Sequence, residues 1–114
     1  MASRRRERLA LATRLAASVI DRLEMRGIKA AVIGSLISGK FDLHSDVDFL
    51  ISKGQMSEGR RQAELLIGET FARSGISTHI VFEDDLDEKL QMEFARDRQI
   101  FGDIRNAAPE ARQS

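Results

Sequence analysis

The chain has 114 residues, which is the length of one domain, and 42% of them are hydrophobic and 32% charged, as in a globular protein. Its 18 basic and 18 acidic side chains give a formal net charge of zero, so the average charge favours neither nucleic acid nor a membrane as a partner. The lack of cysteine excludes disulfides, thiolate zinc sites and cysteine nucleophiles. No apolar run approaches the roughly 18 residues of a membrane span, and we expect a cytoplasmic protein.

The first half of the chain predicts a helix followed by two short strands. Apolar residues recur at three- and four-residue steps from about residue 5 to 26, which is typical of an amphipathic helix, and Gly27 ends it. Residues 29–34 are mostly apolar and predict a buried strand. A helical turn and loop are expected over residues 35–45, and a second strand over residues 47–51.

The second half predicts a helix, a strand and another helix. An amphipathic segment around residues 63–71 is closed at Gly75, and the alternation of residues 76–83 indicates a third strand. Asp84 and Asp85 are expected to cap a helix over about residues 86–98.

The order of these elements predicts one α/β domain, with a small mixed sheet covered by helices, over residues 1–105. Residues 100–104 are expected to form a short packed segment within it. Residues 106–114 contain the only proline and predict a frayed tail.

A glycine and a serine stand where the first strand is expected to end. Gly34 and Ser35 lead into a helical turn, so backbone N–H groups and a hydroxyl can surround an anion such as a phosphate. Lys40 is the nearby basic residue. The alternative interpretation of Gly-Ser is an ordinary turn at a strand end.

Two acidic residues accompany the second strand. Asp46 and Asp48 occupy alternate positions, so their side chains are expected on one face with Cα atoms about 6.6 Å apart. Neighbouring carboxylates repel each other, and a hard cation relieves this repulsion; Mg²⁺ binds one or two carboxylates together with substrate phosphates. The alternative is a pair of solvated residues on an edge strand.

Together these residues resemble a known family. Gly34-Ser35, ten further residues and then Asp46-x-Asp48, followed by apolar residues, are similar to the signature of the minimal nucleotidyltransferases of the DNA polymerase beta superfamily. The resemblance covers about residues 28–82 and implies a nucleotidyltransferase-like fold.

The resemblance also implies the roles of the site residues. Gly34 and Ser35 would bind the nucleotide phosphates, and we expect Lys40, the only basic residue nearby, to bind them as well. Asp46 and Asp48 would be the catalytic residues and bind two Mg²⁺ ions. In such a mechanism one ion activates the attacking hydroxyl and the other stabilises the leaving pyrophosphate.

Two features of the sequence depart from the family pattern. A third carboxylate is usual in the following strand, and the matching residue here is His79, whose side chain we expect to point toward the two aspartates. A neutral imidazole favours softer ions than Mg²⁺, so transferase activity is expected to be attenuated. Glu83 lies on the same face but about 13 Å further along the strand, which makes it a poor substitute. Leu36 and Ser38 stand where arginines often follow Gly-Ser.

The leading hypothesis is a minimal nucleotidyltransferase-like domain that binds a nucleoside triphosphate, expected to be ATP, with Mg²⁺ and transfers a nucleotide to a hydroxyl acceptor. The resemblance implies that a small helical protein of the HEPN type can be the partner that carries the acceptor. The alternative is a non-catalytic nucleotide-binding or partner-binding module, such as an antitoxin-like subunit that acts by association.

Four arginines, at positions 4, 5, 6 and 8, precede the amphipathic part of the first helix. We expect a solvated helix start, and the alternative is contact with nucleic acid or a partner.

Overall fold

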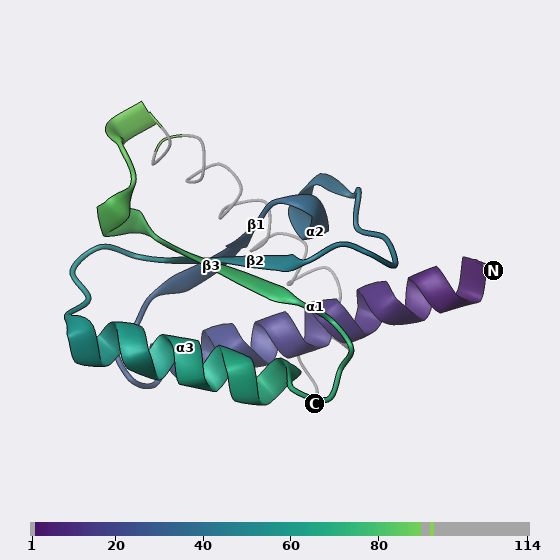
Figure 1. Ribbon diagram of the computed structural model, residues 1–114, viewed down its shortest axis with the longest axis horizontal. Coiled ribbons are helices and arrows are strands. Elements are labelled where there is room, and N and C mark those ends of the chain that lie inside the picture. The colour runs from purple at the N-terminus through teal and green to yellow at the C-terminus, as the bar shows by residue number, and fades with distance from the viewer. Residues whose placement is uncertain (1, 90–91, 93–114) are drawn as a thin grey trace.

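The computed structural model describes residues 2–89 and 92, and Figure 1 shows how they are arranged. The predicted α/β class is confirmed. The elements follow in the order α1 (Ala2–Glu24), β1 (Ala30–Ile33), α2 (Ser35–Ser38), β2 (Val47–Ile51), α3 (Ser57–Phe71), β3 (Thr78–Phe82) and the 3₁₀ turn η1 (Glu83–Asp85).

The strands form one mixed sheet in the order β1-β2-β3. β1 runs antiparallel to β2 with Ile33 opposite Asp48, and β2 runs parallel to β3 with Asp48 opposite His79. Paired residues share a face of the sheet, so these three side chains lie in one row across it. The register therefore brings together two site residues that are 31 positions apart (79 − 48) in the sequence.

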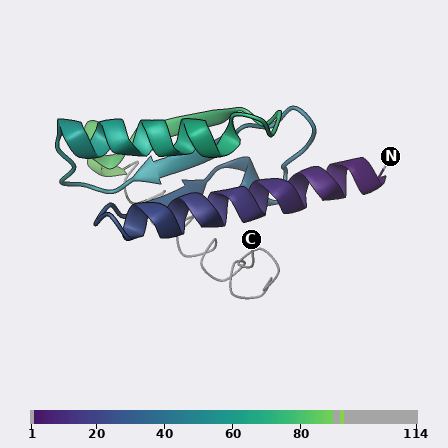
Figure 2. The ribbon, with the colours of Figure 1, turned by 90° about the horizontal axis from the view of Figure 1, so that it is seen from below.

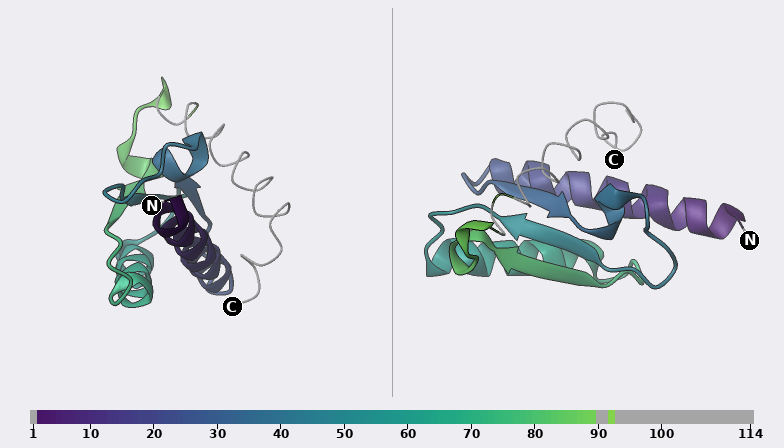
Figure 3. Two further views of the ribbon diagram at one scale, coloured as in Figure 1. Left: turned by 90° about the vertical axis from the view of Figure 1, so that its right-hand side faces the viewer. Right: turned by 90° about the horizontal axis from the view of Figure 1, so that it is seen from above.

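The two long helices cover the opposite face of the sheet, as the end-on view in Figure 3 shows. They lie side by side and run in roughly opposite directions (Figure 2). Val47, Phe49 and Ile51 of β2 are fully buried in the core that these helices complete. The ring of Phe49 meets Phe71 of α3 edge to face, with 5.8 Å between the ring centroids. The helices contribute Ala12, Ala16, Val19, Ile20, Leu23, Ala63, Leu66, Ile67 and Phe71 to this core.

Helix α1 is followed by the predicted glycine stop. Gly27 has a left-handed φ of 77°, its N–H donates to the carbonyl of Glu24 (2.9 Å), and the N–H of Ile28 donates to the carbonyl of Leu23 (3.0 Å). This hydrogen-bond pair is the Schellman motif, which satisfies carbonyls at a helix end. Although α1 has 23 residues, no helix in the described part of the chain has both the length and the apolar character for crossing a membrane.

The segment after β3 differs from the prediction. Asp84 and Asp85 belong to the 3₁₀ turn η1, and Leu86 follows in an extended conformation, so these two acids do not cap a helix that begins at Leu86. Glu88 and Lys89 are helical. The rest of the helix predicted to reach residue 98, the segment at 100–104 and the tail at 106–114 lie outside the described residues, apart from residue 92.

Candidate functional site

The predicted site residues gather at one end of the sheet. Because β1 and β2 are antiparallel, the end of β1 is the neighbour of the start of β2. Gly34 and Ser35 follow β1 directly, Asp48 is the second residue of β2, and His79 is the second residue of β3. Asp46 lies one residue before β2, so the prediction that it belongs to the strand is off by one position.

Gly34 and Asp48 are in direct contact. The backbone of Gly34 has φ 80° and ψ −145°, a conformation close to the region that only glycine adopts without strain. A Cβ atom at this position would also collide with the carboxylate of Asp48. The start of the Gly-Ser turn and one of the two candidate metal-binding acids therefore form a single site.

Asp48 is held in an environment that disfavours its charge. Its side chain is 28% exposed, whereas Asp46 is exposed. Burial raises the pKa of the Asp48 carboxyl; His79 lowers this pKa, and the charge of Asp46 raises it further, so that it lies above its ordinary value. A cation bound at Asp48 would offset the cost of ionising a partly buried carboxyl next to a second acid.

His79 faces Asp48, as predicted. Its Nδ1 atom lies 3.6 Å from Oδ1 of Asp48, and its side chain is 67% exposed. An imidazole at this distance forms an ion pair with the carboxylate when it is protonated and adds no negative charge when it is neutral. The residue at the position expected for a third carboxylate therefore adds no negative charge beside Asp48 in either protonation state.

The short helix α2 places the residues after Gly34. The N–H groups of Ile37 and Ser38 donate to the carbonyl of Gly34 over 3.1 and 3.0 Å. Gly39 closes the turn with a left-handed φ of 79° and an N–H that donates to the carbonyl of Ser35. The first N–H groups of such a turn have no partner within it, which is the property that an anion site requires.

Two of the residues predicted to bind phosphate, Ser35 and Lys40, differ in their contacts with the segment that carries the acids. The hydroxyl of Ser35 donates to the carbonyl of Asp46 over 3.5 Å, which joins the Gly-Ser turn to the start of β2. The backbone N–H of Lys40 donates to the carbonyl of Ser35 over 3.1 Å, and its side chain is exposed. No contact recorded within residues 2–89 fixes the Lys40 ammonium group beside the acids.

The donor atoms suit a hard cation that is shared with a ligand. Asp46 and Asp48 supply carboxylate oxygens, and Mg²⁺ is usually bound by one or two carboxylates, several waters and substrate phosphates. Among the described residues, no group of three or more histidine and acidic side chains is placed to hold a metal ion. The residues therefore fit an ion that arrives with phosphates better than an ion in an all-protein cage.

The loop that leads into Asp46 is organised by its own polar groups. The Asp42 carboxylate accepts hydrogen bonds from the His44 N–H (2.8 Å) and the Ser45 hydroxyl (3.2 Å), and the hydroxyl in turn accepts one from the Asp42 N–H (3.0 Å). These bonds, led by that from His44, lower the pKa of the Asp42 carboxyl. The Asp42 side chain thus closes a turn that mimics a backbone turn, and this turn ends at Ser45, immediately before Asp46.

Arginines of α1 contact this loop, which corrects the interpretation of all four as a solvated helix start. Arg5 donates to the carbonyl of Phe41 over 3.4 Å. Arg8 donates to two carbonyls of the loop, those of Asp42 and Ser45. Sequence inspection missed these contacts because no local pattern marks a bond between residues more than 30 positions apart.

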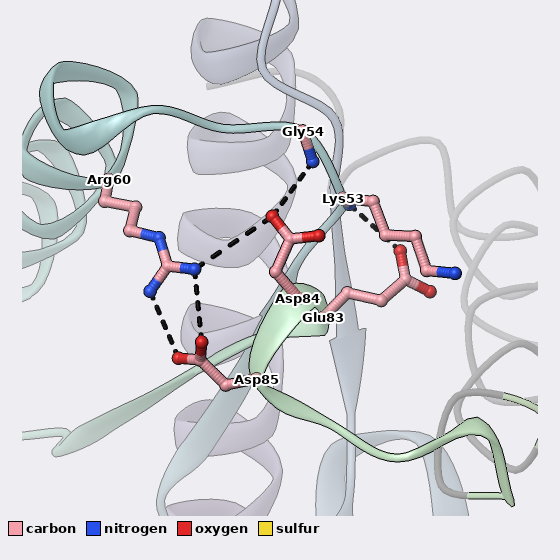
Figure 4. Close-up of polar contacts among 6 residues, drawn as sticks. All are labelled: Lys53, Gly54, Arg60, Glu83, Asp84 and Asp85. Carbon is pink, nitrogen blue, oxygen red and sulfur yellow. Dashed lines mark hydrogen bonds and ion pairs between the residues drawn. The ribbon is translucent and has the colours of Figure 1, made fainter.

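Glu83 is engaged at the far end of the sheet, where β2 and β3 finish (Figure 4). Its Oε1 atom accepts a hydrogen bond from the backbone N–H of Lys53 over 3.0 Å. Asp84 accepts one from the N–H of Gly54, also over 3.0 Å. The expectation that Glu83 is a poor substitute for the third acid agrees with this placement, since its carboxylate binds the loop after β2.

Arg60 completes the polar cluster in Figure 4. Its guanidinium donates two hydrogen bonds to the carboxylate of Asp85, at 3.1 and 3.2 Å, and lies 4.0 Å from Asp84. It also lies over the ring of Phe82, 4.5 Å from the centroid. These contacts join α3 to η1, so the cluster has a structural role away from the candidate site.

A shallow hollow of about 330 Å³ lies elsewhere, between the N-terminal part of α1, the loop before β2 and the turn after α3. Its lining residues are Arg4, Glu7, Arg8, Leu11, Leu43, Ser74 and Ile76. None of the candidate site residues lines it. The acid pair therefore lies outside this hollow, and Asp46 is exposed at the surface.

No protein-family model, curated protein or solved structure matches the chain. The functional interpretation therefore depends on the residues of the site and their geometry.

Proposed function

We propose that the chain is a minimal nucleotidyltransferase-like domain that binds a nucleoside triphosphate, ATP in the first instance, with Mg²⁺ and transfers a nucleotide to a hydroxyl acceptor. The observation that carries the proposal is the contact between the Asp48 carboxylate and the backbone of Gly34. A triphosphate bound to the Gly-Ser turn would stand next to two carboxylates, and a shared cation makes this approach of like charges favourable.

Each predicted residue has a role in this proposal. Asp46 and Asp48 would hold Mg²⁺, which supplies neutralisation of phosphate charge and polarisation of the reacting phosphoryl group. The Ser35 hydroxyl would donate to a phosphate oxygen in place of the Asp46 carbonyl. Lys40 would add a positive charge from the loop that follows. His79 supplies no negative charge where a third carboxylate is expected, so we expect slow transfer.

The second candidate is a module that binds nucleotide or a partner without catalysis, in the manner of an antitoxin-like subunit. The His79–Asp48 contact favours it, because a protonated imidazole 3.6 Å from the acid competes with a cation for the same carboxylate. Both candidates share the Gly-Ser turn and the acid pair, and they differ in whether a nucleotide is transferred.

The exposure of Asp46 favours a partner that completes the site. Phosphoryl transfer depends on positioning the acceptor and limiting water, and an exposed carboxylate provides neither by itself. A small helical protein of the HEPN type, as the family resemblance implies, is the proposed source of the acceptor hydroxyl. A cytoplasmic location, which supplies ATP and Mg²⁺, is part of the same proposal.

Calorimetry with ATP tests the binding half of the proposal. We expect the wild-type chain to bind ATP more tightly with Mg²⁺ than without it, and the Asp46→Asn, Asp48→Asn double variant to lose this metal dependence while it stays folded. Metal-dependent binding that survives in the double variant would remove the acids from the site.

Transfer of labelled nucleotide tests the catalytic half. His79→Asp adds the missing negative charge, so we expect it to raise Mg²⁺ affinity and transfer to the chain itself or to a helical partner. Activity in wild type that falls on this substitution would give His79 a catalytic role of its own. No transfer by either chain, with ATP binding intact, would favour the non-catalytic module.

A further inference from the structure

Arg8 contacts three backbone carbonyls with three different nitrogen atoms. Nε donates to Asp42 over 3.3 Å, Nη1 to Gly75 over 3.2 Å, and Nη2 to Ser45 over 3.5 Å. The guanidinium carbon also lies 5.8 Å from the centroid of the Phe41 ring. One side chain of α1 thus bonds the loop before β2 and the turn before β3.

The contact with Ser45 bears directly on Asp46. The Ser45 carbonyl belongs to the peptide group that ends at Asp46, and a peptide group is planar. Fixing this carbonyl therefore fixes the direction in which the chain enters Asp46. The next residue, Val47, is held by a hydrogen bond from its N–H to the carbonyl of Ser77 over 2.9 Å, so the chain is anchored on both sides of the acid.

We propose that Arg8 is a positioning residue, which holds the loop over residues 41–45 so that the exposed Asp46 stays beside Asp48 for a shared Mg²⁺. The proposal rests on the proposed nucleotide and metal site. Arg5 assists Arg8 through its bond to the carbonyl of Phe41. Neither arginine touches the nucleotide in this role, because both act through the backbone of the loop.

The geometry requires a guanidinium and not only a positive charge. Lysine has the same charge, but its ammonium group is a single point on a flexible stem and cannot reach three carbonyls that a planar fork contacts. Arg8→Lys should therefore fail like Arg8→Gln. Arg14→Gln is the matched control, because Arg14 is an exposed arginine of the same helix and makes none of these contacts.

Amide hydrogen exchange tests the anchoring without nucleotide. We expect the amides of His44 and Ser45, which are bonded to Asp42, to exchange about tenfold faster or more in Arg8→Gln and Arg8→Lys, because charge-assisted bonds to the loop are lost. Exchange within α3 should stay as in wild type and in Arg14→Gln. Unchanged exchange in the loop would overturn the proposal, and so would full protection by Arg8→Lys.

Titration of ATP binding with Mg²⁺ tests the positioning. We expect both Arg8 variants to need several-fold more Mg²⁺ for half-maximal binding than Arg14→Gln, while metal-free ATP binding is unchanged. A general loss of folding would weaken both kinds of binding together. A looser loop with an unchanged Mg²⁺ requirement would overturn the positioning role.

A wild-type chain that binds no ATP with Mg²⁺ would overturn the proposed function and with it the role of Arg8 toward the metal. The hydrogen-exchange result would still decide whether Arg8 anchors the loop.

Discussion

At Asp48 the fold holds a carboxyl where ionisation is disfavoured. Burial is the main cause, and the charge of Asp46 adds to it, while His79 acts in the opposite direction. An aspartate that faced the core would have no neighbour such as His79 to oppose the effect of burial. Asp48 instead lies on the sheet face that carries the site, within reach of the turn at Gly34. The unfavourable charge therefore has a functional interpretation, since active sites are where pKa values are commonly perturbed.

We predict that Asp48→Asn raises the free energy of unfolding at pH 7. The pKa of Asp48 is higher in the folded state than its ordinary value, so between the two values the folded chain binds more protons than the unfolded chain. The wild type therefore loses stability as pH rises through this window, and the asparagine variant does not. Urea unfolding followed by circular dichroism between about pH 3 and 7 measures the difference, which should shrink toward the acid end. Asp46→Asn, which changes the exposed acid, should show a smaller difference in stability. A loss of stability in Asp48→Asn that does not depend on pH would contradict the raised pKa of Asp48 in the folded state.

We predict that Gly34→Ala costs more stability than Gly27→Ala. Both glycines have positive φ, but a Cβ atom meets nothing within 4 Å at Gly27 and collides with the Asp48 carboxylate at Gly34. Backbone strain alone costs about 1–3 kcal/mol, and displacing the carboxylate adds to it. Urea unfolding gives the two costs, and equal costs would mean that Asp48 moves away freely. Because it moves Asp48, Gly34→Ala should also weaken Mg²⁺-dependent ATP binding, which Gly27→Ala should leave intact.

The residues of the candidate site were predictable where their types and spacing carried the information. Gly34, Ser35 and the acid pair stand at the ends of two strands whose apolar runs are visible in the sequence. Arg8 was not predictable in the same way, because an arginine among four in the first turns of an amphipathic helix looks solvated. Its contacts depend on which loop lies opposite the helix, and only the packed structure shows this.

At the scale of elements, local periodicity located β2 and the later turns of α3 well, whereas the helix cap predicted after β3 is wrong. The sequence predicts that Asp84 and Asp85 are helix caps, a role in which a side chain satisfies N–H groups of the next turn. Their partners are instead the N–H of Gly54 and the guanidinium of Arg60, about 25 to 30 positions earlier in the chain. Tertiary contacts thus displaced the local capping role.

We predict a measurable but modest coupling between Arg60 and Asp85. Their two-point hydrogen bond joins α3 to η1, but the side chains are 30% and 61% exposed, so water screens the pair. A double-mutant cycle with Arg60→Gln and Asp85→Asn should give a small favourable coupling in the free energy of unfolding, which falls as the salt concentration is raised. Arg61→Gln is the control, because Arg61 is the exposed neighbour in the same helix. Coupling of Asp85 to Arg61 as large as to Arg60 would show a general charge effect.

At the scale of the whole molecule, one face of the sheet builds the core and the other carries the site. Val47, Phe49 and Ile51 face the helices, so Asp48 between them must face away. A shift of one residue in the strand would turn Asp48 into the core between the sheet and the helices, which is unfavourable for a carboxylate without a partner there. The packing of α1 and α3 therefore also orients the acid. The alternation of β2 could be recognised in the sequence, but its parallel pairing with β3 and the row that includes His79 required the structure.

We predict that this core makes the described domain unfold as one unit, and neighbouring leucines of α3 provide a matched test. Leu66 is 3% exposed in the shared core, whereas Leu65 is 53% exposed. Leu66→Ala should lower the free energy of unfolding by about 2–5 kcal/mol, a large part of the total of a small domain, and Leu65→Ala by about 0.5 kcal/mol or less. The chain has no tryptophan or tyrosine whose fluorescence could report unfolding. Circular dichroism is therefore used to measure the loss of the helices, and the NMR amide resonances of Asp48 and His79 are used to measure the loss of the site. Both signals should be lost at the same urea concentration in each variant, and that concentration should fall only for Leu66→Ala. Site resonances that persist after the helical signal is lost would show that the sheet face with Asp48 does not depend on the helical core for its register.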